Sequence, residues 1–252
     1  MTSATRELIG LHARELLRDR RYFWFALLFP FGMAGIFLGI AQLLPEGGPD
    51  MPDFKQVVVP MALFLAVTGA SLTVTAGPLA AMRTKGTLRL LGTTPVGRAR
   101  LLLTHMPIRL AMVVVQAVLV LALALAIGAV PVSALPALLG ITLLGLAMFG
   151  SIGYLIGGRM NSPDAATNVG TLVQLGALFL SGLAFPLYLF PHGVADALSL
   201  LPSSFFADLM ATQLPGGRPF HEVWVSVAVV AGTTAVAALL AVRTFKWDQG
   251  EV

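Results

Sequence analysis

Long apolar runs separated by short polar segments make up most of this chain. A helix needs about 20 mostly apolar residues to cross a bilayer, and six of the runs are long enough. The predicted spans are residues 22–44, 56–82, 107–130, 136–157, 165–185 and 223–242. The pattern therefore predicts an all-α integral membrane protein with six transmembrane helices, in which residues 1–252 form one transmembrane domain.

Two segments outside these spans also have helical patterns. Residues 2–20 carry leucine and isoleucine on one side and arginine largely on the other, which is typical of an amphipathic helix lying in the membrane interface. Residues 186–222 stay apolar, but Pro202 divides them into pieces of about ten residues, which are too short to span a bilayer. We expect re-entrant or interfacial short helices here, on the outer side of the membrane and packed against protein.

The Lys and Arg residues predict the orientation, because cytoplasmic loops carry an excess of positive charge. With the N-terminus inside, all of the 16 Lys and Arg residues except Lys55 and Arg218 fall on the cytosolic side. The pattern predicts a multi-pass protein of the cell membrane (inner or plasma) with both termini cytoplasmic. The net charge of +4 lies at the ends of the apolar runs, so we expect contact with membrane lipid and no nucleic-acid partner.

Ionisable and polar residues inside the spans bear on transport. Arg109 lies in the first turn of the third predicted span and can extend its side chain to the cytosolic interface; the span centres carry essentially no ionisable residue, which argues against a proton- or sodium-coupled pump. The candidate residues for lining a pathway are Thr68, Ser71, Thr75, Asn168, Thr171 and Gln174. The alternative is that they bond other helices, or carbonyls of their own helix.

Two pairs of glycines have the spacing that lets membrane helices approach closely. They are Gly35 with Gly39 in the first span and Gly153 with Gly157 in the fourth. We expect them to pack helices within one subunit.

A basic loop separates the second span from the third. Its cations are Arg83, Lys85, Arg89, Arg98 and Arg100. Thr87 to Leu91 predicts a short helix with Leu88 and Leu91 on one face, and Gly92 is a typical residue for its end. A helix with leucines on one side and cations around them suits a groove on a cytosolic partner. A topology signal would explain the charges but not this pattern.

Gly86-Thr87-Leu88, followed by Thr94-Pro95, resembles the loop between spans two and three of ABC type-2 exporter permeases, the family that includes drug-resistance and polysaccharide-export permeases. The resemblance implies that this segment is a cytosolic coupling helix that docks on a separate ATPase. Members often have acidic residues just before the glycine, where this chain has Arg83 and Lys85. The residues implied in coupling are Arg83, Lys85, Gly86, Thr87, Leu88, Arg89, Leu91, Thr94 and Pro95.

The same resemblance implies the function of the whole chain. It would be the permease subunit of an ATP-driven exporter, working with two copies of a cytosolic ABC ATPase and with a second permease, identical or related. ATP and magnesium would bind the ATPase, and we expect no cofactor and no metal on this chain and no enzymatic activity of its own. The solute would be amphipathic or lipid-like: a drug, a lipid or a glycan conjugate. Candidate residues for an external gate are Phe185, Phe205 and Phe206.

Two other classes of function stay open. A small intramembrane enzyme acting on lipids would need convergent acid, base or metal-ligating groups. The external residues of these types are His192, Asp196, Asp208, His221 and Glu222, which lack a recognisable ligand spacing. A passive channel or an assembly factor would act without nucleotide.

Overall fold

The computed structural model describes residues 10, 14, 20–43, 54–93, 97–185, 187, 190–214, 217 and 219–247. Every regular element in these residues is a helix. In chain order they are α2 (Arg20–Leu43), α3 (Phe54–Thr68), the π-helix η1 (Gly69–Thr73), α4 (Val74–Thr84), α5 (Thr87–Gly92), α6 (Arg98–Ala126), the short 3₁₀ turn η2 (Val132–Ala134), α7 (Leu135–Arg159), α8 (Pro163–Leu180), α9 (His192–Ser199), α10 (Pro202–Ala211) and α11 (Val223–Arg243).

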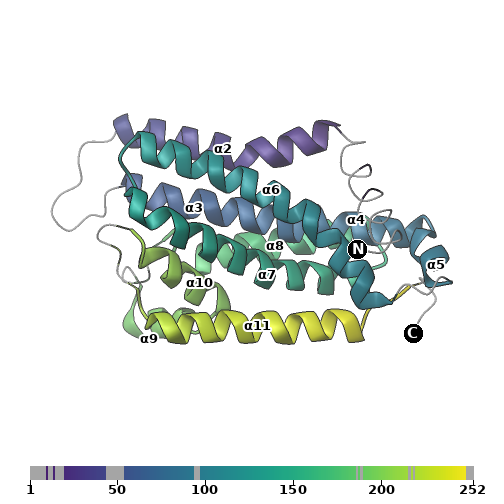
Figure 1. Cartoon of the computed structure of the whole chain (residues 1–252). Coiled ribbons are helices and arrows are strands. Elements are labelled where there is room, and N and C mark those ends of the chain that lie inside the picture. The colour runs from purple at the N-terminus through teal and green to yellow at the C-terminus, as the bar shows by residue number, and fades with distance from the viewer. Residues whose placement is uncertain are drawn as a thin grey trace.

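The long helices lie roughly along one direction and form a bundle, with α5 at one end and α9 and α10 at the other (Figure 1). Within the described residues, four helical stretches are long and apolar enough to cross a membrane: Val58–Thr84, Ala99–Ala126, Val132–Arg159 and Val223–Arg243. The prediction of a multi-pass, all-helical membrane protein agrees with this. The helices α2 and α8 occupy the first and fifth predicted spans, but they are not among these four stretches. The number of six membrane spans therefore stays a prediction.

The second predicted span is the central helix of the bundle. Its most apolar window is 89% buried, against 22% for α11, and it packs against α6, α7 and α8. It is continuous from α3 through η1 into α4, and the wide π turn is closed by the N–H of Val74 donating to the carbonyl of Gly69. A π turn adds a residue to the helix and is often found at functional sites.

Close contact between α7 and this central helix depends on two glycines. An added Cβ at Gly153 would lie 1.9 Å from the carbonyl oxygen of Ser71, and one at Gly157 would lie 2.7 Å from that of Ala76. The Gly153 and Gly157 pair therefore packs helices within one subunit, as predicted. At Gly35 and Gly39 an added Cβ would have no described neighbour within 4 Å.

The two short helices predicted before the last span are α9 and α10, which meet at 93°. The side chains from Ser203 to Met210 are all buried, because α10 packs against α11, α7, α8 and α3. The pair is either a broken span or a re-entrant loop. Its position at the membrane interface, or within the membrane, stays a prediction.

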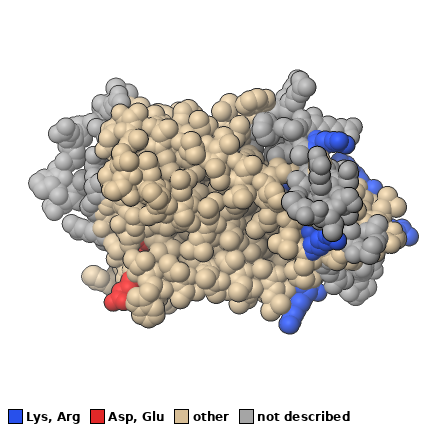
Figure 2. Space-filling model, in the orientation of Figure 1, with Lys and Arg blue, Asp and Glu red and all other residues tan. Residues whose placement is uncertain are grey.

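Basic and acidic side chains lie mostly at opposite ends of the bundle. On the face shown in Figure 2, Lys and Arg gather at the α5 end and the acidic side chains at the opposite end. This distribution fits the orientation predicted from the positive residues. The predicted N-terminal amphipathic helix lies outside the described residues, apart from Gly10, Arg14 and Arg20.

Candidate functional site

The short helix α5 is preceded by a glycine in the left-handed backbone conformation. Gly86 has φ +71° and forms a two-residue turn with Lys85. The N–H of Gly86 donates to the carbonyl of Arg83, and its own carbonyl accepts the N–H of Leu90. Glycine adopts this conformation without the steric cost of a Cβ. The turn therefore ends α4 and starts α5 in a new direction.

The two sides of α5 face different surroundings. Leu88 is 0% exposed and packs in a cluster with Leu79, Leu101 and Phe245, and Leu91 lies against the same cluster. Leu90 is 71% exposed. The face with Leu88 and Leu91, which the sequence suggested for a partner, is therefore turned into the bundle.

The outward side of α5 carries the exposed residues Leu90 and Arg89, and the exposed Lys85 lies in the turn just before the helix. Sequence reasoning missed Leu90, although a signal was present. Residues two positions apart in a helix lie on nearly opposite sides, so Leu88 and Leu90 could not both face the same surface.

Arg83 differs from the exposed cations of the loop because it is only 2% exposed. Its guanidinium donates to the carbonyls of Gly157 at 3.2 Å, Gly158 at 2.6 Å and Met160 at 2.5 Å, and to that of Lys246 at 2.9 Å. The last carbonyls of an α-helix have no partner within the helix, and a cation is favoured at this end. Arg83 thus closes the end of α7 and offers no surface to a docked protein.

Three other predicted coupling residues complete the segment. Thr87, the first residue of α5, is partly buried. Thr94 and Pro95 lie outside the described residues.

The candidate pathway residues of the second span lie inside packed protein. Thr68 and Thr75 donate to the carbonyls of Phe64 and Ala70, and Ser71 is fully buried with no hydrogen-bond partner among the described residues. Within one chain, these side chains are buried between helices, and the two threonines bond to carbonyls of their own span. Their exposure to a pathway stays a prediction.

The candidates of the fifth span are divided between two faces of α8. Gln174 is buried, and its side-chain oxygen accepts the hydroxyl of Thr73 in η1 at 3.3 Å. Thr171 donates to the carbonyl of Thr167. Asn168 is exposed, on the side of the helix that carries Leu172.

Arg109 does not extend to the cytosolic interface, contrary to the sequence-based prediction. The helix α6 begins at Arg98, so Arg109 lies three turns inside it and is 4% exposed. Its guanidinium donates to the carbonyl of Val74 at 3.1 Å. That carbonyl would accept the N–H of residue 78 in a regular helix, but residue 78 is proline and has no N–H. Arg109 supplies the missing donor.

The three candidate gate residues are not brought together. Phe206 is fully buried and forms a cluster with Phe64 and Phe149, whose ring centroids lie 6.1 and 5.7 Å away. Phe205 stacks on His221 at 4.2 Å. Phe185 is exposed and stacks on Phe179 of α8.

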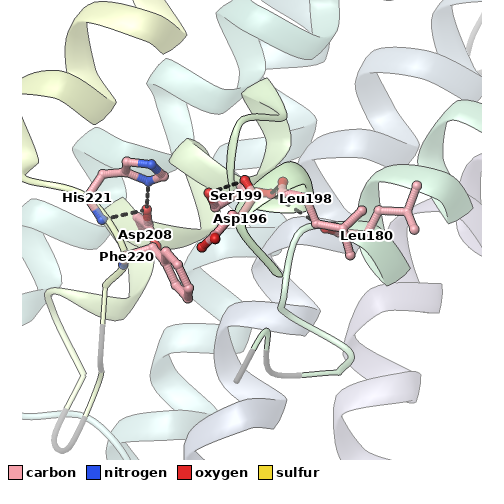
Figure 3. A network of polar contacts seen from close by, with 8 residues as sticks. Leu180, Asp196, Leu198, Ser199, Asp208, Phe220 and His221 are labelled. Atoms are coloured by element: carbon pink, nitrogen blue, oxygen red, sulfur yellow. Dashed lines mark hydrogen bonds and ion pairs between the residues drawn. The ribbon is translucent and has the colours of Figure 1, made fainter. Parts of the chain in front are cut away.

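Of the five external acid and histidine residues, the structure pairs Asp208 with His221 (Figure 3). Asp208 on α10 accepts the backbone N–H groups of Phe220 and His221 at 2.9 and 3.1 Å, and the His221 Nδ1 lies 2.8 Å from it. This carboxylate therefore ties the segment before α11 to α10.

The remaining members of that group are exposed: His192, Asp196 and Glu222. Glu222 accepts the indole N–H of Trp224. Among the described residues, no group of three or more histidine or acidic residues could hold a metal ion.

Comparison with protein families places these elements in a known context. A family model described as ABC-2 family transporter protein matches residues 42–243, which include all the helices from α3 to α11. No curated protein matches the chain.

Proposed function

Because this chain belongs to the ABC-2 family of transporter proteins, we propose that it is the permease subunit of an ATP-driven exporter with a separate cytosolic ATPase. The observation that carries the proposal is the outward side of α5. Leu90 and Arg89 are exposed on this side, and Lys85 is exposed in the turn that precedes the helix. The other side of the helix is anchored in the bundle. An exposed leucine among cations suits a partner groove with an apolar floor and an acidic rim.

The position of α5 supports contact with a protein rather than with lipid tails. It lies at the end of the bundle where the Lys and Arg side chains gather (Figures 1 and 2). Cations at this density belong to the headgroup region or the cytosol. Leu90 would lose its contact with water by docking into the partner, and burial of a leucine contributes about 1.5–3 kcal/mol.

The assembly that we propose contains two permease subunits, identical or related, and two ATPase subunits. ATP with magnesium binds the ATPase, and this chain binds no nucleotide. Closure of the ATPases moves α5, and ATP energy thereby biases the permeases between two arrangements. Both termini of the chain and α5 lie in the cytosol.

The solute that we propose is amphipathic or lipid-like, such as a drug, a lipid or a glycan conjugate, and it moves outward. The exposed side of α8 supports this class of solute. It presents Leu172, Leu175 and Phe179 with the amide of Asn168, a surface that matches a mainly apolar molecule with few polar groups.

The test is co-purification of the ATPase with tagged permease from native membranes. The variant is Leu90→Asp, and the matched control is Leu200→Asp, since Leu200 is 70% exposed at the opposite end. We expect Leu90→Asp to lower the recovered P-loop ATPase about tenfold or more, which corresponds to about 1.4 kcal/mol of docking free energy. Leu200→Asp should recover as much as the wild type.

Leu88 is unsuitable for this test because its burial makes any substitution a test of folding.

Recovery of no ATPase with the functional wild type would overturn the proposed function. Transport without nucleotide would then favour a passive channel. Equal recovery with Leu90→Asp and the wild type would remove α5 as the docking surface.

A further inference from the structure

The segment that follows α11 lies against residues of α4 and α7 at the α5 end of the bundle. In this C-terminal segment (residues 244–247), Phe245 is buried, and both the N–H and the carbonyl of Lys246 form hydrogen bonds. The N–H of Lys246 donates to the carbonyl of Gly158 at 3.0 Å, and its carbonyl accepts Arg83 Nε at 2.9 Å. Phe245 lies 5.9 Å from the Arg83 guanidinium, measured to the ring centroid. The segment is therefore held by α4 and α7 together.

Trp247 carries these contacts to α5. A Cβ built on Gly92, the last residue of α5, would lie 3.4–3.6 Å from three carbons of the Trp247 indole. The indole thus packs on the bare backbone of Gly92. Its ring also meets that of Phe245 edge to face at 5.1 Å. The end of α5 consequently rests on the chain that continues from α11.

We infer that the C-terminal segment is a latch that makes α5 and α11 move together, with Trp247 as its positioning residue. This inference rests on the proposed function. A helix of six residues does not hold its own conformation or position in water, so its contacts decide what it moves. Leu88 anchors α5 in the cluster that holds Phe245 together with Leu79 of α4 and Leu101 of α6, and Gly92 adds the contact with Trp247.

The other end of α11 is attached to the external helices. The residues just before α11 are joined to α10 through Asp208, which accepts Phe220 and His221 (Figure 3). The 21 residues of α11 span roughly 30 Å at 1.5 Å per residue. A displacement of α5 is thereby passed along α11 to α10 and the external end.

The latch is tested by hydrogen exchange of the assembled transporter, with and without magnesium, ATP and vanadate. In the wild type, we expect trapping to change exchange in α5 and in residues 192–214. In Trp247→Ala the response in α5 remains, and the external response falls about fivefold or more. Trp247→Phe, which keeps a ring over Gly92, should retain the external response.

A second variant restores the link covalently. The chain has no cysteine, so Gly92→Cys with Trp247→Cys introduces a single pair of thiols. A Cβ at position 92 would lie 3.5 Å from the present Cγ of Trp247, a separation that suits an attempted disulfide. The reduced form should behave like Trp247→Ala, and oxidation with copper phenanthroline should restore the external response. If oxidation restores the external response in the same folded protein, the loss in the reduced form came from the missing link between α5 and α11 and not from lower stability.

Three results would overturn the inference. The external response could persist in Trp247→Ala and in the reduced cysteine pair. It could also fail to return once the disulfide has formed. If trapping changes nothing in α5 of the wild type, the proposed function falls and the latch falls with it.

Discussion

Two buried arginines have the same task in this protein: each supplies donors to helix carbonyls that the backbone leaves without a partner. Arg83 closes the end of α7, and Arg109 replaces the N–H that Pro78 lacks. Hydrogen bonds from a charged donor are stronger than neutral ones. Both guanidinium groups are therefore structural, and neither is placed like a residue that contacts a soluble partner.

Removing the Arg83 guanidinium should destabilise the protein. Arg83→Gln leaves carbonyls of α7 and of Lys246 without donors, and we expect a loss of about 1.5–3 kcal/mol in thermal unfolding of the detergent-purified chain. Arg159→Gln is the control, because Arg159 is the exposed last residue of the same helix, and it should change stability by about 0.5 kcal/mol or less. Equal stability of the two variants would contradict the role given to Arg83.

At the scale of elements, the central helix is shaped by its π turn and by the glycines that face it. Gly153 and Gly157 let α7 touch the backbone of η1 and α4. Gly77 of α4 and Gly170 of α8 do the same between the central helix and α8. An added Cβ would lie 2.2 Å from Thr167 Oγ1 at Gly77, and 3.3 Å from the backbone of Leu72 at Gly170. Such contacts stabilise membrane helices through close packing, since lipid supplies little hydrophobic drive between them.

Alanine at Gly153 should disrupt this packing. Its Cβ would overlap the Ser71 carbonyl oxygen, and relief requires a backbone shift that costs about 1–3 kcal/mol or more. Gly150→Ala on the same helix is the control, because a Cβ there would have no described neighbour within 4 Å beyond the adjacent turns of α7. We expect Gly153→Ala to lower the unfolding temperature or the yield, and Gly150→Ala to match the wild type. The close approach of α7 would be disproved by a Gly153→Ala variant with wild-type stability.

At the scale of the whole molecule, the bundle has two chemically different ends. Lys and Arg gather around α5, and α9 and α10 lie at the other end (Figures 1 and 2). Asp208 is part of α10. Between them the outer surface exposes large apolar side chains such as Leu172 and Trp224, which suits lipid or a second copy of the chain. This difference between the ends is the basis of the orientation predicted for the protein in the membrane.

Cysteine labelling in intact cells should reveal this orientation. Asn161→Cys introduces an exposed thiol in the link between α7 and α8, at the α5 end, and Leu200→Cys introduces one between α9 and α10. Since the chain has no other thiol, a membrane-impermeant maleimide should label Leu200→Cys directly. Asn161→Cys should react only after permeabilisation. The reverse pattern would show that α5 faces outward.

Much of the architecture could be predicted from the sequence, because bilayer thickness demands long apolar helices and positive charge stays on one side. The short helix after Gly86 and the pieces separated by Pro202 were predicted from local turn chemistry. The family was recognised from Gly86-Thr87-Leu88 and Thr94-Pro95, and the match over residues 42–243 supports it.

Only the tertiary structure decided which side chains of the candidate site are exposed and which are buried. Leu88 and Leu90 look alike in the sequence, but the direction of α5 after its left-handed turn buries the first and exposes the second. In the sequence, Arg83 looks like the other cations of its loop. In the structure, its guanidinium bonds to the carbonyls of Gly158 and Lys246, which lie far along the chain. Periodicity and composition report local preferences, whereas these contacts join residues separated by more than 70 positions, and only packing brings those residues together.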